Sequence, residues 1–100
     1  MEKSKPHYDL DRVKGPIRAG HYRLTRVAFE GGGQLGFKTG EEIAEFVLTL
    51  KNADFYKSMT SNQNHKEWQD VYHVQAPEGR TVYLKFIVIN DVLILSFKEK

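Results

Sequence analysis

Apolar and polar residues alternate most clearly over the last third of the chain, residues 81–98, which read TVYLKFIVINDVLILSFK. Two runs of β-branched and aromatic residues, 81–89 and 92–98, are separated only by Asn90 and Asp91. Because Asn and Asp tolerate positive φ, this dipeptide favours a tight turn between antiparallel strands. The turn predicts a register that pairs Ile89 with Val92, Ile87 with Ile94, Lys85 with Ser96 and Tyr83 with Lys98.

The two faces of this predicted hairpin differ in chemistry. Side chains alternate across a strand, so one face is continuously apolar and must be covered: Leu84, Phe86, Val88, Leu93, Leu95 and Phe97. The other face is aliphatic near the turn and becomes polar at its open end, where Tyr83, Lys85, Ser96 and Lys98 gather. The pattern therefore predicts a polar site held on a rigid sheet, with the rest of the chain covering the apolar face.

The first half of the chain shows helical spacing. Asp9 can cap a helix that ends before Gly20, a typical C-cap residue. The apolar face of this helix is Leu10, Val13 and Ile17. Pro16 removes a hydrogen-bond donor and disfavours helical geometry at Gly15, which predicts a break or kink at that point.

A second short helix is predicted over residues 24–30, with Leu24, Val27 and Ala28 facing inward. The glycine-rich segment that follows has the spacing of a phosphate-binding loop at Gly31 and Gly36, but Lys38 comes one residue late. A phosphate loop also needs a buried strand before it, and here a helical pattern precedes it. We therefore expect this segment to be a flexible loop between helices.

The strongest amphipathic helix is predicted next. Thr39 and Glu42 form a Thr-x-x-Glu capping box at its start. Its apolar face consists of Ile43, Phe46, Val47 and Leu50. Burial of each such side chain contributes on the order of 1.5–3 kcal/mol, so we expect this helix to cover the apolar face of the C-terminal hairpin.

Two further strands are predicted over residues 55–60 and 68–74. If residues 61–65 form the loop between them, Thr60 lies opposite Lys66 and Lys57 opposite Gln69. The predicted fold class is α+β, with N-terminal helices on one face of a C-terminal antiparallel sheet of four strands. A single domain over residues 1–100 is expected, with the charged residues 1–8 as a loosely held arm.

Composition narrows the function classes. The chain has no cysteine, so it has neither disulfides nor a thiolate metal site, and no apolar run approaches the ~20 residues that span a bilayer. A cytoplasmic protein fits best. The net charge of +2 is uneven: residues 1–30 carry seven Lys and Arg against four acids, and residues 31–100 carry the remaining eight against nine. This imbalance permits a polyanionic partner.

Several polar residues are predicted to share the sheet face that points away from the helices: Lys57, Gln69, His73, Tyr83, Lys85 and Lys98. A cluster of cations and a phenol without paired carboxylates differs from a glycosidase site and suits a phosphate group. Metal-free RNA cleavage needs a base for the ribose 2′-hydroxyl, cations near the phosphorane and an acid for the leaving 5′-oxygen. Neighbouring cations would lower the pKa of Lys and Tyr side chains. The alternative is an ordinary solvated sheet face.

Three aromatic residues of the same strands are expected to pack in the core. Trp68 lies on the face opposite Gln69, Tyr56 on the face opposite Lys57, and Tyr72 on the face opposite His73. No two histidines have a spacing that suits metal ligation, so no metal site is expected.

Four stretches resemble the MqsR family of mRNA-interferase toxins in matching order and spacing: DFYKSMT (54–60), WQDVY (68–72), VYLK (82–85) and DVLI-SFKEK (91–100). The opening MEK, Pro6-His7, Val13-Lys14 and Ala19-Gly20 are also similar. The resemblance covers nearly the whole chain and is densest after Asp54.

This resemblance implies a RelE-like toxin that cleaves mRNA, preferentially at GCU, without a metal or other cofactor. It implies Lys57, Gln69 and Tyr83 as catalytic residues, and the lysine near the family's C-terminus falls on Lys98. With Lys85, His73 and Arg80, Lys98 is expected to bind RNA phosphates. The implied partners are mRNA and an MqsA-like antitoxin with zinc-binding and DNA-binding domains, which would dock at an exposed sheet edge. The alternative function is a non-catalytic RNA- or protein-binding module on the same fold.

Overall fold

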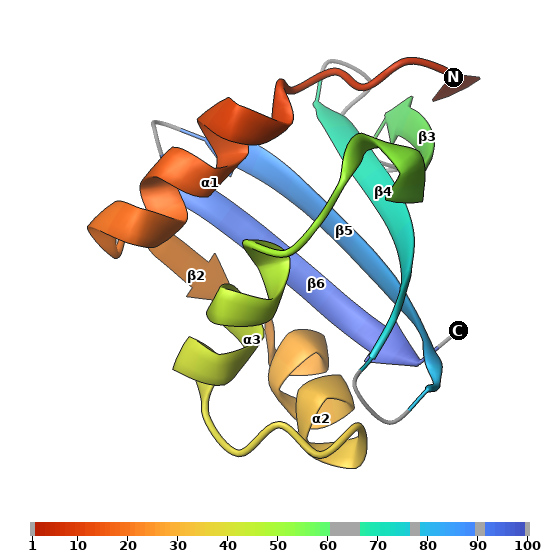
Figure 1. The fold of residues 1–100 in the computed structure, drawn as a ribbon. Helices are drawn as coiled ribbons and strands as arrows, with labels where there is room; N and C mark the ends of the chain where they lie inside the picture. Colours follow the sequence, from red (N-terminus) through yellow and green to blue (C-terminus); the bar gives the residue numbers. More distant parts are fainter. Residues whose placement is uncertain (1, 61–66, 77–78, 90–91, 100) are drawn as a thin grey trace.

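A computed structural model describes residues 2–60, 67–76, 79–89 and 92–99, and the side chains of all but 98 and 99. Its centre is a six-stranded sheet in the order β1-β3-β4-β5-β6-β2, antiparallel except between β2 and β6 (Figure 1). The strands are β1 (Glu2–Lys3), β2 (Tyr22–Leu24), β3 (Phe55–Thr60), β4 (Trp68–Gln75), β5 (Thr81–Ile89) and β6 (Val92–Glu99). The α+β prediction is confirmed, although β1 and β2 were not anticipated.

The register of the C-terminal hairpin is the predicted one. β5 and β6 pair Ile89 with Val92, Lys85 with Ser96 and Tyr83 with Lys98. The turn residues 90 and 91, on which the prediction rests, lie outside the described residues. The alternation of the two strands therefore places the apolar set on one face, as expected.

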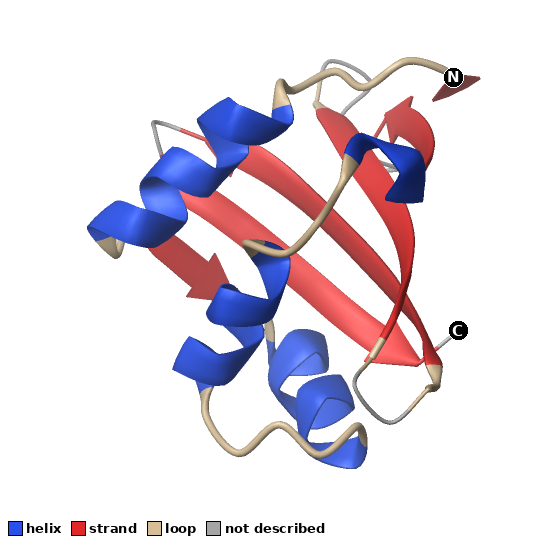
Figure 2. Cartoon of the chain, in the orientation of Figure 1, coloured by secondary structure: helices blue, strands red, loops and turns tan. Residues whose placement is uncertain are grey.

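Three helices cover that apolar face: α1 (Leu10–Ala19), α2 (Arg26–Gln34) and α3 (Gly40–Val47) (Figure 2). The core between them and the sheet includes Val13, Ile43, Val47, Leu84 and Phe97, each at most 1% exposed. Phe46 of α3 lies edge-on to Phe97 of β6, with ring centroids 5.8 Å apart. The capping box is half formed: Thr39 Oγ1 accepts from Glu42 N, while the Glu42 carboxylate accepts from Lys38 N. α3 thus covers the hairpin as predicted.

The predicted break in the first helix is wrong, because α1 runs through Pro16 without interruption. Asp9 caps its start, and Gly20, in the left-handed conformation at φ 79°, ends it. Gly15 has no Cβ, which removes part of the clash that a proline imposes on the residue before it. Burial of the Leu10, Val13 and Ile17 face compensates for the missing hydrogen bond.

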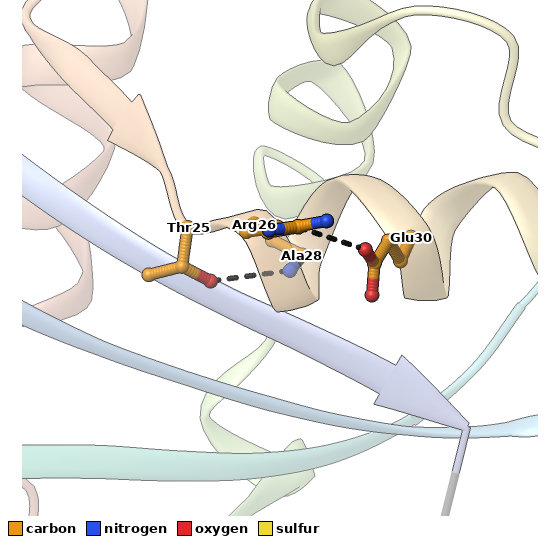
Figure 3. Close-up of polar contacts among 4 residues, drawn as sticks. All are labelled: Thr25, Arg26, Ala28 and Glu30. Carbon is orange, nitrogen blue, oxygen red and sulfur yellow. Dashed lines mark hydrogen bonds and ion pairs between the residues drawn. The ribbon is translucent and has the colours of Figure 1, made fainter.

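The predicted second helix begins and ends elsewhere. Leu24 belongs to β2, which pairs in parallel with β6, and Val27 is 49% exposed rather than inward. Thr25 caps α2 by accepting from Ala28 N, and Arg26 pairs with Glu30 at 3.1 Å along the helix surface (Figure 3).

The triple glycine, predicted to be a flexible loop, is part of α2. Gly31 and Gly32 are buried, and a Cβ at Gly32 would collide with the side chain of Ile43. Glycine is unfavourable in a helix interior, but here it lets α2 and α3 approach closely. The packing between the two helices therefore outweighs the low helix propensity.

The N-terminal arm is not loosely held. β1 pairs with β3 through Glu2–Met59 and Lys3–Ser58. The buried carboxylate of Asp70 accepts hydrogen bonds from the backbone N–H groups of His7 and Tyr8 at 3.0 and 2.9 Å. These contacts join residues more than fifty positions apart, which a local pattern does not reveal.

The arm also explains why Trp68 does not pack in the core as expected. Trp68 is half-buried beneath the arm, where the ring of His7 stacks on it at 5.7 Å and Lys3 Nζ lies 4.2 Å from its centroid. Tyr72 does pack as expected: it is fully buried and stacks on Phe86 at 5.5 Å.

None of the helices in the described part of the chain is both long and apolar enough to span a membrane.

Candidate active site

The candidate residues lie on the sheet face opposite the helices, which we call the open face. Their relative positions depend first on the pairing of β3 with β4. The predicted pairing of Lys57 with Gln69 is wrong, because Lys57 lies opposite Val71 and Gln69 opposite Met59. The shift is two residues, so the alternation is unchanged and Lys57 and Gln69 still share the open face. A shift by an even number of residues keeps every apolar side chain on the same face of the sheet. The pattern of apolar residues therefore does not distinguish the two registers. Lys66, the predicted partner of Thr60, lies outside the described residues.

The pairing of β4 with β5 and β6 brings two rows of candidates together. One row places His73 opposite Tyr83 and Tyr83 opposite Lys98. The next row places Val71 opposite Lys85 and Lys85 opposite Ser96. The prediction that Gln69, His73 and Tyr83 share one face is thus confirmed. The side chain of Lys98 lies outside the described part of the structure, so its placement rests on the backbone register.

The prediction that Tyr56 packs on the covered face is wrong. Tyr56 is 51% exposed, and its ring stacks on His73 with centroids 4.1 Å apart and planes 20° from parallel. The reason is a register shift between Phe55 and Lys57, where Tyr56 is the extra residue of β3 against β4. A β-bulge of this kind interrupts alternation, so two consecutive residues can serve one face. The sequence contains no clear signal for it.

Four side chains consequently form one group, which we call the Tyr83 cluster: Tyr56, Lys57, His73 and Tyr83. His73 lies between the two tyrosines, with its ring centroid 5.4 Å from that of Tyr83. Lys57 Nζ lies 5.3 Å from the centroid of the Tyr56 ring. The cluster therefore places an ammonium, an imidazole and two phenols side by side on a rigid sheet.

Glu2, which the sequence did not single out, forms an ion pair with Lys57. Its Oε1 accepts a hydrogen bond from Lys57 Nζ at 2.6 Å. This hydrogen bond raises the pKa of Lys57, with smaller contributions of the same sign from the charges of Glu2, Tyr56 and Tyr83, and it lowers the pKa of Glu2. The expectation that neighbouring cations lower the pKa of the lysine is therefore wrong for Lys57, which is held protonated.

Gln69 lies away from the His73 and Tyr83 side of the Tyr83 cluster. It lies four residues before His73 on β4, a distance of about 13 Å along the strand. There it lines a pocket of about 240 Å³ that we call the Gln69 pocket. The other open-face side chains of this pocket are Lys85, Ile87, Ile94 and Ser96, and Thr25 and Val27 contribute from the start of α2.

Arg80 does not join either group. Its guanidinium donates a hydrogen bond to the carbonyl oxygen of Gln34, at the C-terminal end of α2, at 3.0 Å.

Two larger hollows, of about 330 and 580 Å³, lie beside the N-terminal arm and share Tyr8 and Asp9 in their linings. They contain none of the predicted site residues. Within the described ranges no three His, Asp or Glu side chains are grouped so that they could hold a metal ion.

Comparison with known proteins assigns the family. The family model described as "Motility quorum-sensing regulator, toxin of MqsA" matches residues 5–99. The chain is also 46% identical to the mRNA interferase toxin MqsR of Escherichia coli (strain K12), over 100 residues that cover the whole of both chains. A full-length match of this strength agrees with the resemblance seen in the sequence. The chain therefore belongs to the MqsR family of mRNA-interferase toxins.

Proposed function

We propose that this chain is a metal-independent endoribonuclease that cleaves single-stranded mRNA on its open face, with the GCU preference that its family resemblance implies. The observation that carries the proposal is the Tyr83 cluster. In it Lys57, His73 and Tyr83 lie together on three neighbouring strands, β3, β4 and β5. These side chains supply a fixed positive charge and two groups that can exchange protons. Cleavage of RNA by its own 2′-hydroxyl needs these functions and no others.

In the proposed reaction the scissile phosphate binds beside Lys57 and displaces the Glu2 carboxylate. His73 accepts the proton of the 2′-hydroxyl, because imidazole is the side chain whose ordinary pKa lies nearest neutrality. The 2′-oxygen forms a bond to phosphorus, and the bond from phosphorus to the 5′-oxygen breaks. Tyr83 donates its phenolic proton to that leaving oxygen. The products are a 2′,3′-cyclic phosphate and a free 5′-hydroxyl, and the two side chains recover their protonation states by exchange with water.

The remaining candidates hold the RNA in this scheme. Lys57 stabilises the additional negative charge of the phosphorane with its ammonium group, because the ordinary pKa of lysine lies well above neutrality. Lys85 lies two residues from Tyr83 on β5 and adds a second positive charge beside the phosphate backbone. Gln69 orients the nucleotide next to the cleaved linkage from the Gln69 pocket. Lys98, whose backbone pairs with that of Tyr83, serves as a further phosphate contact.

The proposed protein partner is an MqsA-type antitoxin, as the family description "toxin of MqsA" supports. The family resemblance implies that this antitoxin has zinc-binding and DNA-binding domains. The outermost strands of the described sheet are β1, with two residues, and β2, with three. Strands this short leave backbone groups of their neighbours available for an added strand. Co-purification of the two proteins, with and without residues 1–8 of the toxin, would show whether the β1 edge takes part.

The enzymatic proposal is tested by single-turnover cleavage of a defined mRNA in excess EDTA. Wild-type protein is expected to leave 2′,3′-cyclic phosphate ends, and Lys57→Ala and Tyr83→Phe are expected to cut at least a hundredfold more slowly. Lys38→Ala and Tyr22→Phe remove the same groups outside the open face and should cut at the wild-type rate. RNA that is bound but left intact by the wild type would favour the non-catalytic module. Cleavage abolished by EDTA would rule out the metal-independent mechanism.

A further inference from the structure

We infer that the Gln69 pocket is a binding site for one unstacked nucleobase of the RNA, and that it contributes base preference next to the cleaved linkage. The inference rests on the proposed ribonuclease function and extends it from the reacting phosphate to the neighbouring base. It assigns a role to Ile87 and Ile94, which the sequence placed only on the aliphatic part of this face, and it gives Ser96 a specific role within the predicted polar site.

The lining of the pocket has the two kinds of surface that a nucleobase requires. Ile87 and Ile94 are opposite each other on β5 and β6 and provide an apolar wall for the face of a ring. Gln69 and Ser96 provide an amide and a hydroxyl that can pair with the polar edge of the ring. Single-stranded RNA is read in this way, by bases splayed out of the stack and held by apolar contact and edge hydrogen bonds.

The size of the pocket fits a ring system better than an ion or a water molecule. Its volume is about 240 Å³. An engineered protein cavity of about 150 Å³ is large enough to bind benzene. The pocket can therefore take a base, while Lys85, which also lines it, stays near the phosphate of the same nucleotide.

Its position connects it to the Tyr83 cluster. Lys85 lines the pocket and follows Tyr83 by two residues on the same face of β5, a distance of about 7 Å. An RNA strand with its scissile phosphate at the cluster thus passes Lys85 before the next base reaches Ile87 and Ile94. This continuity, and the positive charge of Lys85, favour RNA over a protein segment as the occupant.

The test is cleavage of an RNA library randomised around one cut site, followed by sequencing of the products. Ser96→Ala and Ile87→Ala should each reduce discrimination at one nucleotide position by about tenfold, because a lost hydrogen bond or wall contact costs roughly that factor. Discrimination at the other positions should not change. Ile89→Ala removes the same side chain two residues further along β5, outside the pocket, and should keep the wild-type preference. Melting temperatures verify that each variant is folded.

Other results overturn the inference. Two folded pocket variants that keep the wild-type preference would show that the pocket does not read a base. Variants that keep the preference but lose binding to the antitoxin would assign the pocket to a protein segment. A wild-type protein that cuts no member of the library would overturn the proposed function itself, and the base site with it.

Discussion

The carboxylate of Glu2 lies 2.6 Å from the ammonium of Lys57, although the two residues are separated by 55 positions in the chain. The pairing of β1 with β3 brings them together, since Glu2 lies opposite Met59, two residues beyond Lys57 on the same strand. The carboxylate occupies the place where a substrate phosphate would contact the lysine. In the proposed reaction, the RNA phosphate therefore competes with a carboxylate of the protein itself for Lys57.

Glu2→Gln is expected to lower the KM for RNA by a factor of about two to five, which is the range of an exposed ion pair. The rate at saturation should change little, because the lysine keeps its contact with the phosphate. Steady-state cleavage at low salt measures both quantities. Glu45→Gln, which removes the same charge from the exposed surface of α3, serves as the control and should leave KM unchanged. An unchanged or higher KM in Glu2→Gln would show that Glu2 does not compete with RNA.

Tyr56 is expected to act by holding the imidazole of His73, on which it stacks at 4.1 Å. Tyr56→Leu should lower kcat by about tenfold, in the range of a lost aromatic contact. Tyr56→Phe keeps the stacked ring and should retain nearly full activity. The pH dependence of kcat distinguishes the two explanations. If Tyr56 positions the proposed base His73, Tyr56→Leu changes the shape of the pH profile, whereas a general loss of stability lowers kcat without changing that shape. Equal losses in the two variants would assign the effect to the Tyr56 hydroxyl instead.

Gly32→Ala and Gly33→Ala should have opposite effects on stability, although the two glycines are adjacent in α2. A methyl group at Gly32 meets the side chain of Ile43, and overpacking of this kind costs about 1–3 kcal/mol. At Gly33 nothing lies within 4 Å, so alanine should stabilise the helix by about 0.5–1 kcal/mol. Urea denaturation of both variants measures the free energy of unfolding. A loss of stability in both would mean that the glycines are needed for backbone conformation rather than for close packing.

Tyr72 should make the protein sensitive to alkali. Burial raises the pKa of its phenol from 10.0 to about 12, because the ionised form is poorly solvated there. A folded-state pKa above the unfolded value means that stability is complete below pH 10 and is lost as pH rises toward 12. The loss should reach about 1.4 kcal/mol per pH unit.

Tyr72→Phe tests this assignment, because it removes the titrating group and keeps the ring stacked on Phe86. The Tyr72 hydroxyl is buried, and no hydrogen-bond partner for it lies among the described residues. The variant should therefore be as stable as wild type at pH 8, and more stable near pH 11. Denaturation curves at both pH values provide the measurement. Parallel losses in the two proteins would place the alkaline transition at another group.

The residues of the open face were predictable, because the face on which a side chain lies depends only on whether its position in the strand is odd or even. The turn at residues 90 and 91 predicted every pair from Tyr83 to Ile89, and these pairs are present. Between β3 and β4 the predicted register was wrong by two residues, yet Lys57 and Gln69 remained on the open face. Parity did not predict which residues lie side by side: Gln69 lies opposite Met59 rather than Lys57, because neighbours across two strands depend on the register itself.

The sequence by itself determined the features that depend on neighbours in the chain. These are the caps of α1 and α3, the buried faces of those helices, the alternation of the four long strands and the family resemblance. Each follows from residues a few positions apart, where spacing and side-chain chemistry leave one favourable arrangement.

Only the tertiary structure decided the contacts that complete the candidate site. It placed Glu2 against Lys57, turned Tyr56 onto His73 through a bulge, and packed Gly32 beneath Ile43 so that a glycine run became a helix. In each case the local pattern did not distinguish between two outcomes. The choice between them came from packing and pairing partners that are distant in the sequence, and these contacts form only when the sheet and helices assemble.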